Sequence, residues 1–448
     1  MKKLALLFSL TLFTACFTIS ALIPPFQSPD EFDHVKRAYL LTQGQIFLET
    51  PEGQSSGGMI DSGLFSYFIP YNEILARRDS KIHFDREYDD IRWTGQKEFR
   101  QAPCYFPFIY APQAAGLFIG QILGLSVATS YLLAKITALA ISCLIIFYAF
   151  SIYSPPPLAA GLLLIPMTMF QMASASLDGI STAISILALS LFMRIAVDKE
   201  KSKPWFLYAL CLCVILVATT RTHLLTMIFL VFATFLYTKN KRSLIAGFVV
   251  TTFVALWTIY SLTGVVDKRV IRDVSTSSII SYYAQDPISL LRVIIQTLKN
   301  SDNLRFYAES FVGILGWLDA RFSASVYVSL YFLLFALVLS SVSFKAFKSQ
   351  WRERVLLLCC AIGSFFFIFF ALLIGWNPHP AVIIGGVQGR YFLVPAIMLA
   401  YSIDSATRIK SQAFHYAGIL LLIALLLLSS FTTTKLLLSR YYISSPNS

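Results

Sequence analysis

The sequence carries little charge for its length. Asp, Glu, Lys and Arg make up 13% of the 448 residues, about half the share of roughly 25% that is typical of soluble domains. Apolar residues make up 56%, and the mean hydropathy is +0.68. So few charges do not cover the water-facing surface of a globular domain. The composition therefore excludes a soluble protein and predicts an all-α polytopic membrane protein.

The sequence also lacks the cysteine patterns of a disulfide framework or a zinc site. Its seven cysteines show no paired CxxC spacing. All but Cys104 fall in apolar runs, where cysteine acts as a small hydrophobic residue. The formal charge is +12, but no stripe of Lys and Arg lies on a polar domain, so nucleic acid is not an expected partner.

Long apolar runs take the place of charged surface. A bilayer core needs about 20 apolar residues per helix. The first run, residues 4–23, follows Lys2 and Lys3, and we interpret it as an uncleaved first helix and not as a signal peptide. Together with ten later runs it gives about eleven spans. The later runs lie near 128–150, 157–175, 178–197, 205–220, 223–238, 243–263, 324–343, 355–375, 391–406 and 414–434.

Lys and Arg gather in every second loop between these runs. Because short cytoplasmic loops are enriched in these residues, Lys2 and Lys3 place the N-terminus inside. The alternation holds only if the Pro- and Gly-containing stretch 105–124 does not cross the membrane. We therefore predict an interfacial helix there, lying along the membrane, and a periplasmic C-terminus. The predicted inside loops are 199–203, 239–242, 345–354 and 408–410.

This topology divides the chain into five parts and leaves its polar sequence on the outer side. Residues 24–104 contain 13 acids against nine Lys and Arg, the opposite balance to the inside loops. The chemistry is therefore expected at the outer face. The parts are the first transmembrane helix 1–23, a periplasmic loop with interfacial helices 24–127, a transmembrane bundle 128–263, a second periplasmic loop 264–323 with an amphipathic stretch near 287–298, and C-terminal transmembrane helices 324–448.

Ionisable residues are densest where the first helix leaves the membrane. Pro29, followed by Asp30 and Glu31, suits the first turn of a helix, where the dipole favours acids. Asp30, His34 and Arg37 then share one face of that helix. A solvated helix start accounts for the pattern. At the membrane surface, however, a carboxylate in a low dielectric can also act as a general base.

Further candidates interrupt the outer ends of later runs. Asp178 either caps a helix or belongs to the site. Arg390 follows glycines whose free N–H groups, with the guanidinium, would seat a phosphate; in the alternative, it snorkels to the interface beside Tyr391. The remaining candidates for substrate binding are Trp317, Asp319, Arg321 and Gln388. No set of histidines has metal-ligand spacing.

Four blocks of sequence carry a resemblance to a known family. They are Pro24–Arg37, Gln171–Asp178, Phe311–Asp319 and Gln388–Pro395. In this order, and over nearly the whole chain, they resemble the DUF2142 family of predicted bacterial membrane proteins. That family is similar to the GT-C glycosyltransferases, which take sugars from polyprenyl-phosphate donors on the outer face of the membrane.

The resemblance implies a GT-C-like fold and roles for residues in the first, second and fourth blocks. It implies that the base is an acid of the first outer loop, here Asp30 or Glu31. It implies that Asp178 shapes the site or helps to hold a divalent cation, the one cofactor considered, and that Arg390 binds the donor phosphate. In function it is similar to glucosyltransferases that modify O-antigen.

These observations lead to the expectation of a glycosyltransferase in the bacterial inner membrane. It would transfer a sugar, with glucose expected, from an undecaprenyl-phosphate donor to a hydroxyl of a surface glycan acceptor such as O-antigen, with inversion. A lipid phosphate is a good leaving group, so one carboxylate base and one arginine meet the chemical minimum.

Two other functions remain open. A flippase for lipid-linked oligosaccharides, or a polysaccharide transporter, would line its bundle with charged residues, and few lie within the predicted spans. A ligase or polymerase of surface polysaccharide would use the same site with a different donor.

Overall fold

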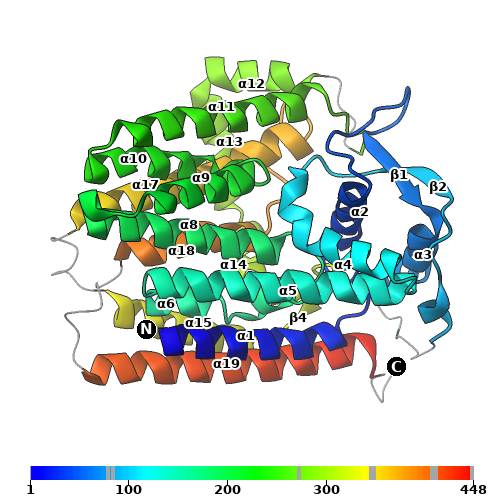
Figure 1. Cartoon of the computed structure of the whole chain (residues 1–448), viewed down its shortest axis with the longest axis horizontal. Helices are drawn as coiled ribbons and strands as arrows, with labels where there is room; N and C mark the ends of the chain where they lie inside the picture. Colours follow the sequence, from blue (N-terminus) through cyan, green and yellow to red (C-terminus); the bar gives the residue numbers. More distant parts are fainter. Residues whose placement is uncertain are drawn as a thin grey trace.

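The computed structural model describes residues 2–76, 81, 86–269, 274–342, 350–403 and 412–443. Within these ranges helices dominate, and the strands form two short antiparallel pairs. The long helices run side by side, and short elements form a layer at one end of the bundle, on the right in Figure 1. All seven cysteines are free, as the sequence predicts.

Seven helices in the described ranges are long and apolar enough to cross a membrane. They are α1 (Lys2–Leu22), α5 (Val127–Ile152), α8 (Asp178–Asp198), α11 (Lys241–Thr263), α15 (Ala324–Ser341), α17 (Trp351–Trp376) and α19 (Gln412–Tyr441). Three shorter apolar helices lie among them: α9 (Pro204–Ala218), α10 (Ile228–Thr238) and α18 (Leu393–Ile403). The chain is therefore an all-α membrane-embedded protein, and the count of about eleven crossings stays a prediction.

The apolar run predicted near 157–175 is not one helix. It forms α6 (Pro157–Leu162) and α7 (Pro166–Met172), with a break before Pro166. Proline interrupts a helix because it has no N–H and its ring clashes with the preceding turn. The prediction of one continuous helix here is wrong, and a crossing by the broken segment stays a prediction. The broken segment instead brings the end of α7 to the outer layer.

The segment between α1 and α5, the first one that the sequence predicts to lie outside, folds into short helices and one strand pair. β1 (Gly57–Asp61) pairs antiparallel with β2 (Lys97–Gln101), with Gly57 opposite Gln101. α2 runs across the direction of the long helices (Figure 1). The helical elements are α2 (Glu31–Thr42), α3 (Ser62–Ala76), η1 (Arg86–Asp90), η2 (Pro107–Tyr110) and α4 (Ala111–Ile122).

α4 corrects the prediction of a helix lying along the membrane. It packs antiparallel to α5, with Gly116 against Ala134 and Gly120 against Ser130. A Cβ on Gly116 would lie 2.5 Å from the backbone nitrogen of Ala134. Twelve residues make about 18 Å of helix, too short to cross a core of about 30 Å. α4 follows the direction of α5, and that the stretch 105–124 does not cross the membrane stays a prediction.

The reason is that α5 extends beyond the end of α1. Lys135, more than two turns into α5, donates to the carbonyl oxygen of Ser20 at 3.0 Å, near the end of α1. The turns of α5 before Lys135 therefore project past α1, and α4 packs against them. This contact depends on the two glycines that let the backbones approach closely.

The second outer segment lies at the same end. It contains α12 (Thr276–Gln285), α13 (Pro287–Lys299), which covers the predicted amphipathic stretch, α14 (Ser301–Gly313), β3 (Ile314–Leu315) and β4 (Ala320–Arg321). α14 packs against the short helix η5 (Gly389–Phe392).

The end of α19 also reaches this layer. The Nε of Arg440 lies 2.8 Å from an Asp319 carboxylate oxygen, and the Trp317 indole N–H donates to the Phe26 carbonyl oxygen. Residue 441 therefore lies at the end of the bundle that holds the first outer segment. The charged positions 345, 348, 408 and 410 and the final residues 444–448 lie outside the described ranges.

Candidate functional site

Asp30 stands on a tightly held left-handed turn. Asp30 and Phe26 both have positive φ, 61° and 62°, a conformation rare for residues other than glycine. Phe26 is fully buried among the rings of Phe32, Tyr67 and Tyr131. Such strained backbone persists only where its surroundings fix it, and it is concentrated at functional sites. Asp30 contacts the buried Arg390 from this turn, and 48% of the Asp30 side chain is exposed.

Glu31, the next residue, is fully buried. Its Oε1 accepts hydrogen bonds from the Tyr131 hydroxyl and the Ala175 N–H, both at 2.7 Å. Its Oε2 accepts from the Ser28 N–H at 3.2 Å. A carboxylate enclosed and bonded in this way fixes the start of α2 against α5 and the loop before α8.

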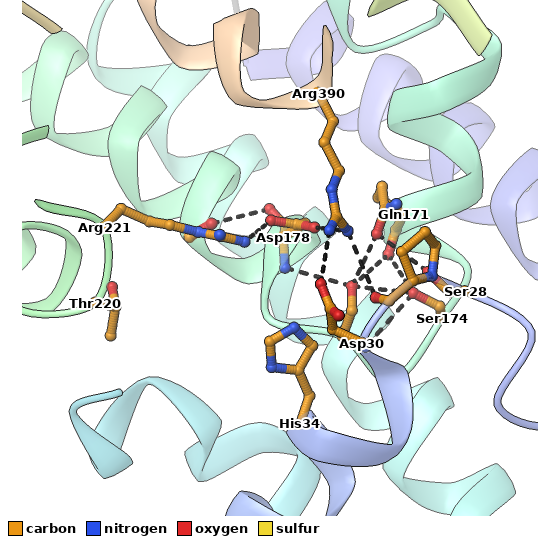
Figure 2. A network of polar contacts seen from close by, with 12 residues as sticks. Ser28, Asp30, His34, Gln171, Ser174, Asp178, Thr220, Arg221 and Arg390 are labelled. Atoms are coloured by element: carbon orange, nitrogen blue, oxygen red, sulfur yellow. Dashed lines mark hydrogen bonds and ion pairs between the residues drawn. The ribbon is translucent and has the colours of Figure 1, made fainter. Parts of the chain in front are cut away.

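Arg390 enters the site from η5 (Figure 2). Only 4% of its side chain is exposed. Its guanidinium lies 2.8 Å from an Asp30 oxygen and 3.1 Å from an Asp178 oxygen. The sequence alternative of a snorkelling arginine therefore does not describe this side chain, which points into the protein. The geometry joins the first, second and fourth family-like blocks in one place.

Arg221 completes a chain of alternating charges. It pairs with the Asp178 oxygen that Arg390 does not contact (Figure 2). Asp178 is the first residue of α8, where the helix dipole favours an anion. The order Asp30, Arg390, Asp178, Arg221 thus links four elements of the fold by ion pairs, and 15% or less of each of the last three side chains is exposed.

A cavity of about 30 Å³ lies against this charge chain. Arg221, Arg390 and Asp178 line it, together with Gln171 of α7 and Tyr391. The Tyr391 ring lies 5.3 Å from the Arg390 guanidinium and 6.0 Å from that of Arg221. Asp30 does not line the cavity, but it pairs with Arg390, which does.

Electrostatics keep Asp30 ionised and His34 neutral. Burial alone would raise the pKa of the Asp30 carboxyl, but the neighbouring charge and hydrogen bond of Arg390 outweigh it and hold the pKa below its usual value. Burial lowers the pKa of His34 to about 3. His34 Nδ1 lies 2.8 Å from the Tyr110 hydroxyl oxygen. The imidazole is therefore an uncharged neighbour of the carboxylate near neutral pH.

Other residues predicted to bind substrate lie elsewhere. Arg37 is fully buried and donates to the carbonyl oxygens of Tyr105, Gln45 and Ile46, so it ties loops together. Arg321 pairs with Glu309 at the surface. Trp317 donates a hydrogen bond to the Phe26 carbonyl oxygen, and Asp319 pairs with Arg440. Gln388 does not line the cavity.

The glycines before Arg390 do not form the predicted phosphate seat. The Gly389 N–H donates to the Ser310 hydroxyl at 2.8 Å, and the Gly385 N–H donates to Asn377 Oδ1 at 2.7 Å. These N–H groups are therefore occupied by protein partners. What the glycines provide is close approach, because a Cβ on Gly389 would lie 2.0 Å from the Phe311 nitrogen.

The site does not fit the divalent cation considered from the sequence. In the parts of the chain that the structure describes, no three His, Cys, Asp or Glu side chains lie together as ligands. The two acids of the site, Asp30 and Asp178, already pair with arginines. We therefore derive no step through a metal.

Sequence reasoning missed Arg221. It lies in the short polar stretch Thr219–Thr222 between two apolar runs, on the side predicted to be outer. A single arginine between closely spaced runs is a detectable signal. Its pairing with Asp178, 43 residues away, appears only in the fold.

Fold and site together define a polytopic membrane protein with a buried cluster of charges at the end of its bundle. Comparison with known families assigns it further. A family described as predicted membrane protein (DUF2142) matches residues 12–400, and the chain belongs to this family. The matched range includes all four members of the charge chain. No curated protein matches the sequence.

Proposed function

We propose that this protein is a GT-C-type glycosyltransferase of the bacterial inner membrane. It transfers a sugar, with glucose as the first candidate, from an undecaprenyl-phosphate donor to a hydroxyl of a surface glycan on the periplasmic side. The observation that carries the proposal is the contact between the half-exposed Asp30 and the buried Arg390. A carboxylate base and a phosphate-binding cation are the two groups this reaction requires.

The reaction proceeds as a single inverting displacement. The acceptor hydroxyl oxygen attacks the anomeric carbon of the sugar while Asp30 takes the hydroxyl proton. The bond between that carbon and the phosphate oxygen breaks, and its electron pair stays on the phosphate. Arg390 holds this phosphate through charged hydrogen bonds. Glu31 and Phe26 fix the backbone that orients Asp30.

Donor binding would also strengthen the base. In the resting site Arg390 pairs with Asp30 and holds the pKa of that carboxyl low, which makes it a weak proton acceptor. A donor phosphate competes for the same guanidinium. When Arg390 turns to the phosphate, Asp30 loses this partner and its pKa rises. The base is then available only when donor is bound.

An apolar groove supports a donor that carries a lipid chain. It has a volume of about 470 Å³ and lies between α13 and α17. Leu290, one of its residues, packs on a cluster of buried apolar side chains that includes Phe369 and Ile384. Tyr391 and Phe392, beside Arg390, pack on the same cluster. The groove is lined by Pro287, Leu290, Leu291, Ile294, Gly363, Phe366, Phe367 and Phe370.

The experiment compares cells with the gene, without it, and with Asp30→Asn. Mass spectrometry of the surface glycan should show a sugar that is present only with the intact gene, and the undecaprenyl-phosphate sugar should accumulate in the other two strains. If the protein were a flippase, deleting the gene would instead leave the lipid-linked glycan on the cytoplasmic side, and Asp30→Asn would not block sugar transfer. An unchanged glycan in all three strains would contradict the proposal.

A further inference from the structure

We propose that Arg221 is a second cation of the donor-phosphate site, and that the phosphate released in the reaction bridges Arg221 and Arg390. This inference rests on the proposed function and adds to it. It assigns to Arg221 the role of stabilising the negative charge that appears on the leaving phosphate when the sugar is transferred.

Arg221 is held in place as a ligand-binding arginine would be. Its backbone N–H donates to the Val217 carbonyl oxygen at 2.8 Å, at the end of α9, and its side chain is 11% exposed. The guanidinium lies between the rings of Tyr105 and Tyr391, at 5.8 and 6.0 Å. Together with Arg390 it lines the cavity of the site.

Asp178 shows that one small anion can reach both arginines. One of its carboxylate oxygens contacts Arg221 and the other contacts Arg390. The fork of donors on a guanidinium matches carboxylate and phosphate geometry alike. A phosphate on the cavity side of Asp178 is therefore within reach of both guanidinium groups.

The charge change in the reaction calls for two cations. A lipid phosphate joined to a sugar is a phosphodiester with a single negative charge. After transfer it is a monoester that carries about −1.5 to −2 at neutral pH. In the resting site the two arginines face the two carboxylates of Asp30 and Asp178. Arg390 turning to the phosphate matches the first charge, and Arg221 matches the second.

Such a residue stabilises the product and the transition state more than the substrate. An interaction that strengthens as charge develops raises kcat with little effect on KM. Arg221 is therefore expected to discriminate between the monoester and the diester. A residue that only balances the charge of Asp178 would show no such preference.

The test measures binding of undecaprenyl phosphate to the purified full-length protein in detergent, by native mass spectrometry or titration. Asp178→Asn alone leaves both arginines without their shared acid. Asp178→Asn with Arg221→Gln removes the second cation on the same background. Relative to Asp178→Asn, the double variant should bind about 10- to 100-fold more weakly, the range for a lost charged hydrogen bond. Arg194→Gln, which breaks the part-buried pair with Asp198 near the end of α8, is the matched control and should bind normally.

The pH dependence of undecaprenyl-phosphate binding separates phosphate binding from a purely structural role of Arg221, because a structural role would leave that dependence unchanged. The second ionisation of a phosphate monoester has a pKa of about 6. Binding should therefore tighten from pH 5 to pH 8 in Asp178→Asn, and this tightening should be lost in the double variant. Should the double variant not fold, Arg221→Lys should keep the tightening but bind more weakly.

The outcomes separate the two proposals. Equal affinity and equal tightening in Asp178→Asn and the double variant, with weak binding by Arg390→Gln, would overturn the role of Arg221 and leave the proposed function standing. Unaltered affinity in Arg221→Lys would also count against Arg221. Absence of binding by the unmodified protein, or unchanged binding in Arg390→Gln, would overturn the proposed function itself.

Discussion

Asp30 and Glu31 are neighbours in the sequence whose surroundings separate their roles. Asp30 sits on a left-handed turn with half of its side chain accessible, whereas Glu31 is enclosed and accepts three hydrogen bonds. A base must reach the proton that it removes. The geometry therefore favours Asp30 as the base and Glu31 as a positioning residue.

The first prediction distinguishes these two acids. Asp30→Asn keeps the shape of the side chain but removes the base, so sugar transfer should fall about 10²- to 10⁴-fold while protein level and melting temperature hold. Glu31→Gln replaces a buried carboxylate that accepts three hydrogen bonds, so it should lower the melting temperature more than it lowers the transfer rate. Transfer assays in membranes at matched expression, with melting curves in detergent, measure both effects. Full activity in Asp30→Asn with an inactive but stable Glu31→Gln would exchange the roles.

The second prediction concerns the shape of the cation at position 390. A guanidinium contacts Asp30 and Asp178 at once through its fork, whereas an ammonium group acts as a point charge. Arg390→Lys should therefore raise the activation free energy of transfer by about 1–3 kcal/mol, the range for a lost charged hydrogen bond. Kinetics in membranes give this value. The conservative change Arg321→Lys, at an exposed pair with Glu309, serves as the control and should leave transfer intact.

The third prediction follows from the pKa of His34. The folded value is about 3, below the ordinary 6.5, so the unfolded chain binds more protons as the pH falls. The stability contributed by this group is fully present above about pH 6.5 and is progressively lost between pH 6.5 and pH 3. His34→Gln should therefore lose less melting temperature between pH 7 and pH 5 than the unmodified protein. His379→Gln controls for removal of an imidazole; the same pH slope in all three would refute the assignment.

At the scale of elements, close packing places η5 against α14 so that Arg390 points inward. Gly389 approaches Tyr307 and Phe311 of α14, and its N–H is bonded to Ser310. No residue with a side chain fits this contact without moving the backbone. The glycine therefore acts through geometry, and the arginine that follows it depends on that contact.

The fourth prediction tests this contact. A Cβ at position 389 would lie 2.0 Å from the Phe311 nitrogen, so Gly389→Ala should destabilise the fold by about 1–3 kcal/mol and reduce transfer. Gly375→Ala is the control, because a Cβ there meets nothing within 4 Å. Melting temperature and transfer should both fall for residue 389 only. An equal response of the two variants would show that the approach of η5 to α14 is not needed.

At the scale of the whole molecule, segments from the beginning and the end of the chain meet at one end of the bundle. The loop that contains Phe26 contacts Trp317, and Asp319 of the same hairpin pairs with Arg440 near the end of α19. The chain therefore ends its last described helix beside the layer that holds Asp30. The opposite end carries the lysines near positions 199–203 and 239–242.

The fifth prediction concerns topology. A reporter fused after Asn447 should be periplasmic, and one fused after Asn240 should be cytoplasmic, because α19 ends at the opposite end of the bundle from residue 240. Alkaline phosphatase and a fluorescent protein, active on opposite sides, measure this. Two fusions on the same side would show that the number of crossings between them is wrong by one.

Some of the site could be predicted from the sequence because the signals are local. Asp30 after Pro29, Asp178 between two apolar runs and Arg390 after glycines each interrupt an apolar pattern. Hydropathy likewise identified the membrane class and the positions of the long helices. It did not separate α6 from α7, although Pro166 is a local signal for such a break. It could not show that α4 follows α5, since that depends on packing partners.

The sequence by itself determined that this is a helical membrane protein, and it predicted that the polar residues gather on one side, because hydrophobicity and charge act residue by residue along the chain. Only the tertiary structure decided that Arg390 turns inward, that Arg221 joins Asp178, and that Glu31 is enclosed. These are pairings over 43 to more than 200 residues of sequence. Their physical cause is the folding of separate helices around one buried charge cluster, where each ion must find a partner.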